Sequence, residues 1–110
     1  MILVYNVTVK VGHQIADEWL EWMRTIHIPN VLATGAFNKC RLSKLDMKED
    51  DGVTYVFQYD CFSEDDLNRY MIHDAPALQK EVIDKYATRF VAFRTILNVV
   101  EEIYRHDQQS

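Results

Sequence analysis

The sequence has few of the residues that interrupt or cross-link a chain. Among its 110 residues are 3 glycines, 2 prolines and 2 cysteines. Such a composition excludes a collagen-like or linker-rich chain, and two cysteines are too few for a disulfide scaffold. The length fits one domain. We expect residues 1–100 to form a single α+β domain and residues 101–110 to be a polar tail.

Positive charge and long apolar runs are scarce as well. Lys and Arg number 12 against 17 Asp and Glu, which gives a net charge of −5. Because an acidic surface repels a phosphate backbone, we expect no nucleic-acid partner. No run approaches the ~18 apolar residues of a membrane helix, and the first residues lack the pattern of a signal peptide. We therefore expect a cytoplasmic protein that does not enter a membrane.

Strand-like and helix-like segments alternate along the chain. β-branched and aromatic residues predict strands at residues 2–9, 35–45, 53–61 and 89–100. Apolar residues at helical spacing predict a helix over residues 14–28, which Pro29 kinks or ends and which one irregular turn follows.

The second helical region has its own start signals. Ser63 precedes three acidic residues, so it is expected to cap a helix. Asp74 is a candidate cap for a further segment that Pro76 opens and that runs to about Tyr86.

Pairing of the two middle strands can be estimated from the loop that ends at Gly52. This pairing places Cys40 opposite Gln58 and Cys61 opposite Phe37. The two sulfurs are then out of register for a disulfide, and we expect reduced thiols.

The element order predicts a ferredoxin-like βαββαβ fold with a four-stranded antiparallel sheet and both helical regions on one face. The other sheet face should be polar if it meets water, but both faces of the first and the last predicted strands are apolar. We therefore expect this bare sheet face to close a homodimer. Alternate residues of a strand point to opposite faces, and one assignment of apolar side chains to the bare face is Ile2, Val4, Phe90, Ala92 and Ile96.

A resemblance to a known family covers nearly the whole chain. It is carried by residues 19–23, 27–37, 53–59, 73–76 and 90–95. The sequence resembles an uncharacterised bacterial domain-of-unknown-function family within the dimeric α+β barrel superfamily. The resemblance implies two ferredoxin-like subunits packed sheet against sheet. The superfamily includes cofactor-free monooxygenases, haem-degrading enzymes and isomerases, so the resemblance supports a fold more than a function.

The haem-degrading branch of that superfamily implies a site made of an Asn on the first strand, a Trp and an axial His. Asn6 and His73 lie on the corresponding elements, but both tryptophans are on the first helix. Placing the more apolar residues of the first strand under the helices also sends Asn6 to the dimer side.

No motif predicts a metal site or a cofactor. The four histidines have no metal-binding spacing. His27 is interpreted as a side chain at a helix end, where exposed carbonyls favour the imidazolium. His73 is interpreted as a partner for backbone groups freed by the break in the second helical region. No nucleophile stands next to a base, and no glycine-rich phosphate loop is present.

The sequence predicts a protein that binds a small apolar or aromatic molecule between helices and sheet, or one that acts as a non-catalytic interaction module. The alternative is a cofactor-free monooxygenase or a haem-degrading enzyme of the same fold. Most of the aromatic residues are also explained as core. The candidate ligand-binding residues are Asn6, Trp22, His27, Gln58, Tyr59, His73 and Arg94.

Arg94 is the one charge in the middle of the last predicted strand. Because a guanidinium stays ionised when buried, we expect it to be paired. Asp60 or Gln58, on a neighbouring or partner strand, is the candidate for a structural pair. The alternative is an anion clamp, in which Arg94 holds a carboxylate of a ligand.

Overall fold

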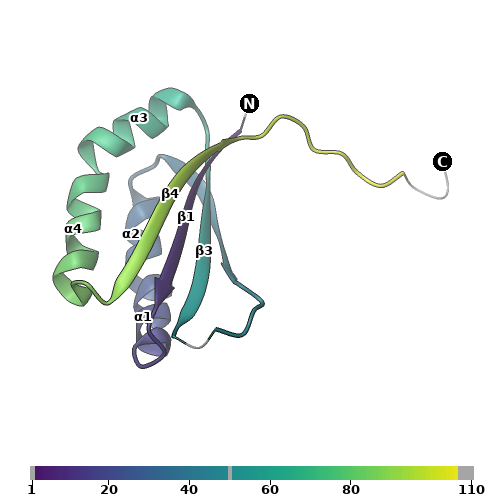
Figure 1. Cartoon of the computed structure of the whole chain (residues 1–110). Helices are drawn as coiled ribbons and strands as arrows, with labels where there is room; N and C mark the ends of the chain where they lie inside the picture. The colour runs from purple at the N-terminus through teal and green to yellow at the C-terminus, as the bar shows by residue number, and fades with distance from the viewer. Residues whose placement is uncertain (1, 50, 107–110) are drawn as a thin grey trace.

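The computed structural model describes residues 2–49 and 51–106 and consists of a four-stranded antiparallel sheet with all its helices on one face (Figure 1). This is the predicted ferredoxin-like fold, with the strand order β2-β3-β1-β4. The elements are β1 (Leu3–Val11), α1 (Ala16–Trp22), the π-helical segment η1 (Met23–His27), α2 (Ile28–Ala33), β2 (Phe37–Lys44), β3 (Val53–Cys61), α3 (Glu64–His73), α4 (Ala75–Tyr86) and β4 (Phe90–Asn98).

β1 lies inside the sheet and pairs with β3 on one side and β4 on the other. Residues directly opposite each other in antiparallel strands share a face. Val7 lies opposite Phe57 of β3 and Arg94 of β4, so these three side chains point to the same side. That side is the one covered by helices, because the odd-numbered residues of β1 pack in the core.

The core fills the space between this sheet face and the helices. Trp19 of α1 and Tyr86 of α4 are fully buried in it. The Trp19 ring stacks on Tyr55 with centroids 5.6 Å apart and meets Phe57 edge-on at 5.5 Å. Burial of a side chain of this size stabilises the fold by at least about 1.5–3 kcal/mol, so the apolar stripe of the first helix fixes that helix on the sheet.

The first helix is longer than the sequence suggested. We expected it to kink or end near Ile28, but the chain continues through η1 into α2 and reaches Ala33. The amide of Ile28 donates to the carbonyl of Met23, five residues earlier. Pro29, which has no amide proton, occupies the first turn of α2, where no donor is needed. The π turn therefore absorbs the proline without ending the helix.

β2 and β3 form the predicted hairpin, but with a shifted register. Phe37 lies opposite Cys61 as expected, and an irregularity between Phe37 and Lys39 then moves the pairing by one residue. Cys40 consequently faces Tyr59 and not Gln58. A bulge adds one residue to one strand, and no residue pattern in this strand announced it. Both cysteines are free, as predicted.

The caps of the second helical region differ from each other. The Ser63 hydroxyl accepts from the amide of Asp66 at 3.1 Å, which confirms the predicted cap of α3. Asp74 stands at the start of α4, but its side chain makes no capping hydrogen bond. Its backbone is already helical, since α3 runs almost directly into α4. The expectation that Asp74 caps α4 was wrong.

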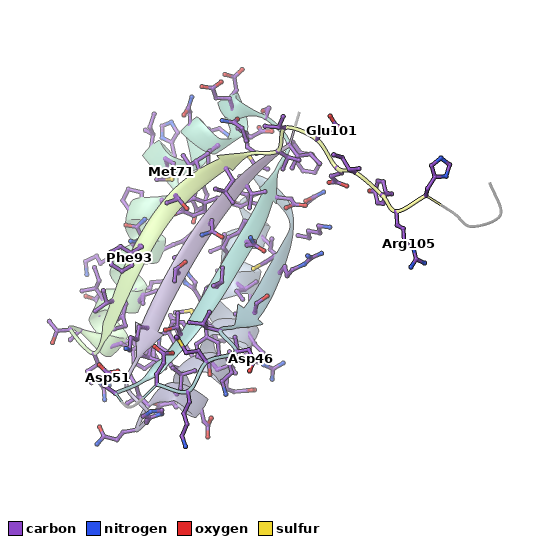
Figure 2. All side chains as sticks on the ribbon, turned by 45° about the vertical axis from the view of Figure 1, so that its right-hand side comes forward. Asp46, Asp51, Met71, Phe93, Glu101 and Arg105 are labelled. Carbon is purple, nitrogen blue, oxygen red and sulfur yellow. The ribbon has the colours of Figure 1, made fainter. Side chains whose placement is uncertain are left out.

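The open face of the sheet, on the side away from the helices, is in front in Figure 2. The predicted parity was correct for Val4 and wrong for Phe90, Ala92 and Ile96, which share the helix-covered face with the odd-numbered residues of β1. The open face is also more polar than expected over β1, β2 and β3. Its side chains are Val4, Asn6, Thr8, Lys10, Lys39, Arg41, Ser43, Thr54, Val56, Gln58, Asp60, Val91, Phe93, Thr95 and Leu97. Its exposed apolar residues gather on β4.

The loop between β2 and β3 is fastened to β1. Lys10 pairs with Asp51 at 2.7 Å and with Glu49 at 3.2 Å. Gly52 follows this loop and lies against the end of β1. A Cβ added to Gly52 would be 2.4 Å from the carbonyl oxygen of Val11. Because that neighbour is backbone, it cannot move aside without disturbing the strand.

We predict that Gly52→Ala destabilises the fold by about 1–3 kcal/mol, the usual cost of overpacking. The matched control is Gly12→Ala, because a Cβ at Gly12 would meet nothing within 4 Å. The free energy of unfolding in urea measures both variants. Equal stability of the two variants would contradict the close approach of Gly52 to β1.

Candidate functional site

A cavity lies between the helices and the central strands. Its volume is about 50 Å³, or about 490 Å³ when all the space that opens to solvent is counted. Its walls are largely apolar and aromatic, with a few polar groups, which is the usual make-up of a small-molecule site. The lining residues are Tyr5, Val7, Val9, Trp19, Met23, His27, Val31, Phe57, Tyr59, Tyr70, Leu78, Gln79, Val82, Phe90, Ala92 and Arg94.

His27 and Arg94 are the main polar side chains of the cavity wall, and the backbone explains how both come to line the cavity. His27 is the last residue of η1, and the π turn changes the direction in which residues of the first helix point. Arg94 lies on β4 opposite Val7, so the pairing of β4 with β1 forces it to the helix-covered face. β4 is the edge strand there, and Arg94 remains exposed. Arg94 therefore lies at the mouth of the cavity.

The imidazole of His27 is neutral at physiological pH. Burial, together with the nearby positive charge of Arg94, lowers its pKa from 6.5 to about 4. The interpretation of His27 as an imidazolium at a helix end was wrong, because the helix continues to Ala33 and the ring is desolvated. Among the described residues that line the cavity, Arg94 is the one that carries a charge at neutral pH.

Arg94 has no structural ion pair within residues 2–49 and 51–106. The predicted partners within the sheet, Asp60 and Gln58, point to the open face. Asp60 is taken by Lys39, at 3.6 Å. The expectation of a pair between Arg94 and either of them on a neighbouring strand was wrong, because β4 places Arg94 on the opposite side of the sheet.

Three buried polar atoms lack a hydrogen-bond partner in the described part of the chain: Nε1 of Trp19, Nδ1 of His27 and the hydroxyl of Tyr86. The first two belong to residues that line the cavity. An unsatisfied buried polar atom costs about 1–3 kcal/mol. Two residues of the cavity wall thus carry a buried polar atom without a partner in the described part of the chain.

Trp22 supports His27 from outside the cavity lining. Its ring stacks on the imidazole with centroids 5.7 Å apart and an interplanar angle of 21°. The Tyr86 ring lies edge-on to the Trp22 ring with centroids 5.8 Å apart, and the Lys85 ammonium lies 5.8 Å from the centroid of the Trp22 ring. These contacts fix the orientation of the imidazole.

Tyrosines form another part of the wall. Burial raises the pKa of Tyr59 and of Tyr70, so both phenols stay protonated and act as hydrogen-bonding groups. Burial also raises the pKa of Cys40, which faces Tyr59, to about 11. Cys40 is therefore a thiol, not a nucleophilic thiolate.

The structure brings together His27, Tyr59 and Arg94 of the predicted site residues, with Trp22 behind His27. It does not bring in the other three. Asn6 and Gln58 lie opposite each other on the open face, where Asn6 donates to the Thr95 hydroxyl at 3.3 Å. His73 is exposed at the end of α3. Asn6 and His73, the residues matched to the haem-degrading branch, are therefore on different faces of the molecule.

Sequence reasoning missed Trp19, Tyr70 and Gln79 as wall residues. The first two lie on the apolar stripes of their helices and were counted as core. The available signal was that each carries a polar atom on a buried stripe, where it needs a partner. Gln79 carries a similar signal, since this polar residue follows Leu78 on a half-buried part of α4.

Metal ligands do not gather anywhere in the described part of the chain: no three His, Cys, Asp or Glu side chains there form a group that could hold an ion. None of the described helices is long and apolar enough to cross a membrane.

The chain is a ferredoxin-like α+β protein with a cavity between helices and sheet. The chain belongs to the family described as Domain of unknown function (DUF4286), whose model matches residues 1–100. No curated protein matches the sequence.

Solved structures with the same fold have very different sequences. One is a dimeric ferredoxin-like protein from an uncultured marine organism, with a TM-score of 0.68 and 10% identity over 93% of this chain and 98% of that one. A second is a mutant of a cofactor-independent oxygenase from Streptomyces nogalater, with a TM-score of 0.66 and 12% identity over 94% and 98% of the two chains.

A third similar structure is a monooxygenase from Streptomyces coelicolor in complex with nanaomycin D. Its TM-score is 0.66 and its identity is 15%, over 94% of this chain and 92% of that one. At such identities, these likenesses establish the fold and leave the function to the site itself.

We predict that His27 makes the stability of the protein depend on pH. Between pH 6.5 and about 4 the unfolded chain binds a proton that folded His27 does not, so stability falls as the pH drops through this range. The expected loss between about pH 7 and about pH 5 is about 2 kcal/mol. Urea unfolding of His27→Gln should lack this loss, whereas His73→Gln, an exposed control, should keep it. An equal pH dependence in wild type and His27→Gln would contradict the lowered pKa.

Proposed function

We propose that the cavity binds a small planar aromatic molecule that carries an anionic oxygen, and that the protein does so as a homodimer. The observation that carries the proposal is the unpaired guanidinium of Arg94 at the mouth of an aromatic cavity. The wall behind it holds the unpartnered Nε1 of Trp19 and Nδ1 of His27.

The chemistry of the walls specifies the ligand. Aromatic rings and aliphatic side chains favour a flat apolar body. A carboxylate suits Arg94, whose planar guanidinium binds its two oxygens through two parallel hydrogen bonds, and a phenolate oxygen can accept from the same group. A neutral His27 does not compete with Arg94 for the anion, and its Nδ1 is free to pair with a ligand hydroxyl.

The anion-clamp interpretation of Arg94 is supported over the structural pair, because neither expected partner within the sheet reaches it. A cation without a partner in a partly apolar site does not stabilise the free protein. The same cation strengthens binding of an anion, because it forms charge-assisted hydrogen bonds with the anion.

We further propose that two copies meet through their open faces. Phe93 is 68% exposed, Val91 56% and Leu97 43%, and all three lie on the β4 part of that face. The dimeric ferredoxin-like protein from an uncultured marine organism has the same fold. Two free cysteines are compatible with a reducing compartment, so we place this dimer in the cytoplasm.

A second candidate function is oxygenation of the bound aromatic molecule without a cofactor. It is favoured by one observation, the neutral imidazole with an unpartnered Nδ1 in the same cavity as a cation. Such a nitrogen can accept a hydrogen bond from a phenol and Arg94 can stabilise a phenolate, the form that molecular oxygen, the oxidant, would attack. Oxygen uptake with an electron-rich phenol as substrate, abolished in His27→Gln, would establish this function beyond binding.

We predict that Arg94→Gln weakens binding of 2-naphthoate by about ten- to hundredfold, the usual contribution of a hydrogen bond to a charged group. Binding of the neutral isostere naphthalene-2-carboxamide should change much less. Calorimetric titration measures both ligands. The control is Arg24→Gln, because Arg24 is an exposed residue paired with Glu21 at 2.7 Å, outside the cavity.

The melting temperature separates the clamp from a structural role. Arg94→Gln should keep the wild-type melting temperature or raise it, because a cation without a partner is removed. A large loss of melting temperature would contradict the clamp, and so would equal loss of affinity for the naphthoate and the amide.

We predict that the protein sediments at twice its chain mass of 13.0 kDa at micromolar concentration, with an interface of at least about 1,000 Å². Phe93→Ser should weaken this dimer. Ile83→Ser, an exposed residue on α4, serves as the matched control. Sedimentation of the wild-type protein as a monomer would refute the dimer.

A further inference from the structure

The chain leaves the fold after β4 and continues as the C-terminal arm, residues 99–106, which projects away from the body (Figures 1 and 2). Its root is fixed, since the amide of Val99 donates to the carbonyl of Ile2 at 3.0 Å. Beyond that point Val100 is 95% exposed, Ile103 83% and Tyr104 81%. Three large apolar side chains on one projecting segment indicate a surface that another chain covers.

The open face of the sheet contains a groove next to the root of the arm. Its described walls are the apolar side chains of Ile2 and Val4, the cations Lys39 and Arg41, Gln58 and Asp60, and, at its edge, Val99 and Glu102 from the start of the subunit's own arm. Val4 belongs to β1, and the two cations belong to β2, beyond β3. On the face proposed to meet a second copy, the groove thus has an apolar part and a charged part, in which Asp60 pairs with Lys39 and Arg41 has no ion-pair partner within residues 2–49 and 51–106.

The charges of the arm complement those of the groove. Glu101 and Glu102 are acidic residues of the arm, and Figure 2 shows Glu101 near its root. Arg41 is exposed and has no ion-pair partner within residues 2–49 and 51–106. Lys39 is held only by Asp60, at 3.6 Å.

We propose that the C-terminal arm of each subunit lies in the groove of its partner, so that the dimer is closed by two reciprocally exchanged arms. Ile103 and Tyr104 cover Ile2 and Val4 of the other copy, and Glu101 pairs with its Arg41. This inference rests on the proposed homodimer. It adds the element that holds the dimer together and that fills the groove.

The geometry of the arm favours the partner over the subunit's own sheet. In Figure 1 the arm runs away from the sheet to which it is attached. An extended segment of this length spans roughly 25 Å at about 3.3 Å per residue. Facing sheets pack about 10 Å apart, so the arm is long enough to reach along a second copy.

The experiment measures the dimer dissociation constant of the full chain by sedimentation equilibrium. The variant Ile103→Ser/Tyr104→Ser should raise this constant at least about tenfold, because two apolar side chains lose their burial. Ile72→Ser is the control, since Ile72 is an isoleucine of α3 with 68% exposure. It should leave the constant unchanged, and melting temperatures should show that all variants are folded.

A charge exchange tests the pairing itself. Arg41→Glu and Glu101→Arg should each weaken the dimer, and the two together should restore it to within about threefold of wild type. A dimer that is unaffected by the arm variants, or a double variant without restoration, would overturn the exchanged arm while leaving the homodimer intact. A wild-type monomer would overturn both. A dimer with free arms that capture added peptides would identify another protein as the occupant and would also overturn the proposal.

Discussion

The pairing between β1 and β4 determines on which side of the sheet the charge of Arg94 lies. Because opposed residues of antiparallel strands share a face, the core position of Val7 places Arg94 toward the helices. A shift of the register by one residue would move that guanidinium to the open face and would turn Phe93 inward. The positive charge at the mouth of the cavity follows from this register, and it adds to burial in lowering the pKa of His27.

The energetics of the cavity are those of a site prepared for an absent partner. Trp19 Nε1 and His27 Nδ1 are buried without partners, and Arg94 is a cation without a counterion among the described residues. The two buried atoms are unfavourable in the free protein, whereas the exposed guanidinium of Arg94 is solvated by water. The surrounding aromatic core is stable enough to maintain this arrangement, since Trp19 is anchored between Tyr55 and Phe57.

Most of the fold could be predicted from periodicity, because strand and helix patterns depend on neighbouring residues. Val53–Cys61 was predicted with its observed bounds, and the Ser63 cap was predicted from four residues. Features that depend on the whole fold were not predictable in this way. The bulge that shifts Cys40 and the π turn that carries the helix past Pro29 depend on packing between distant segments. The parity of β4 was missed because both faces of that strand are apolar, so only pairing with β1 reveals its orientation.

The same limit applies to the site. Of the predicted ligand-binding residues, His27, Tyr59 and Arg94 line the cavity, whereas Asn6, Gln58 and His73 lie elsewhere, since nothing local to them reveals the face they occupy. The central claim is that Arg94 holds an anion in the helix–sheet cavity. A crystal structure with bound 2-naphthoate tests it most directly. The account predicts the carboxylate on the Arg94 guanidinium and the rings beside Trp19. A cavity filled by the protein's own side chains, with Arg94 paired to a carboxylate of the partner subunit, would contradict it.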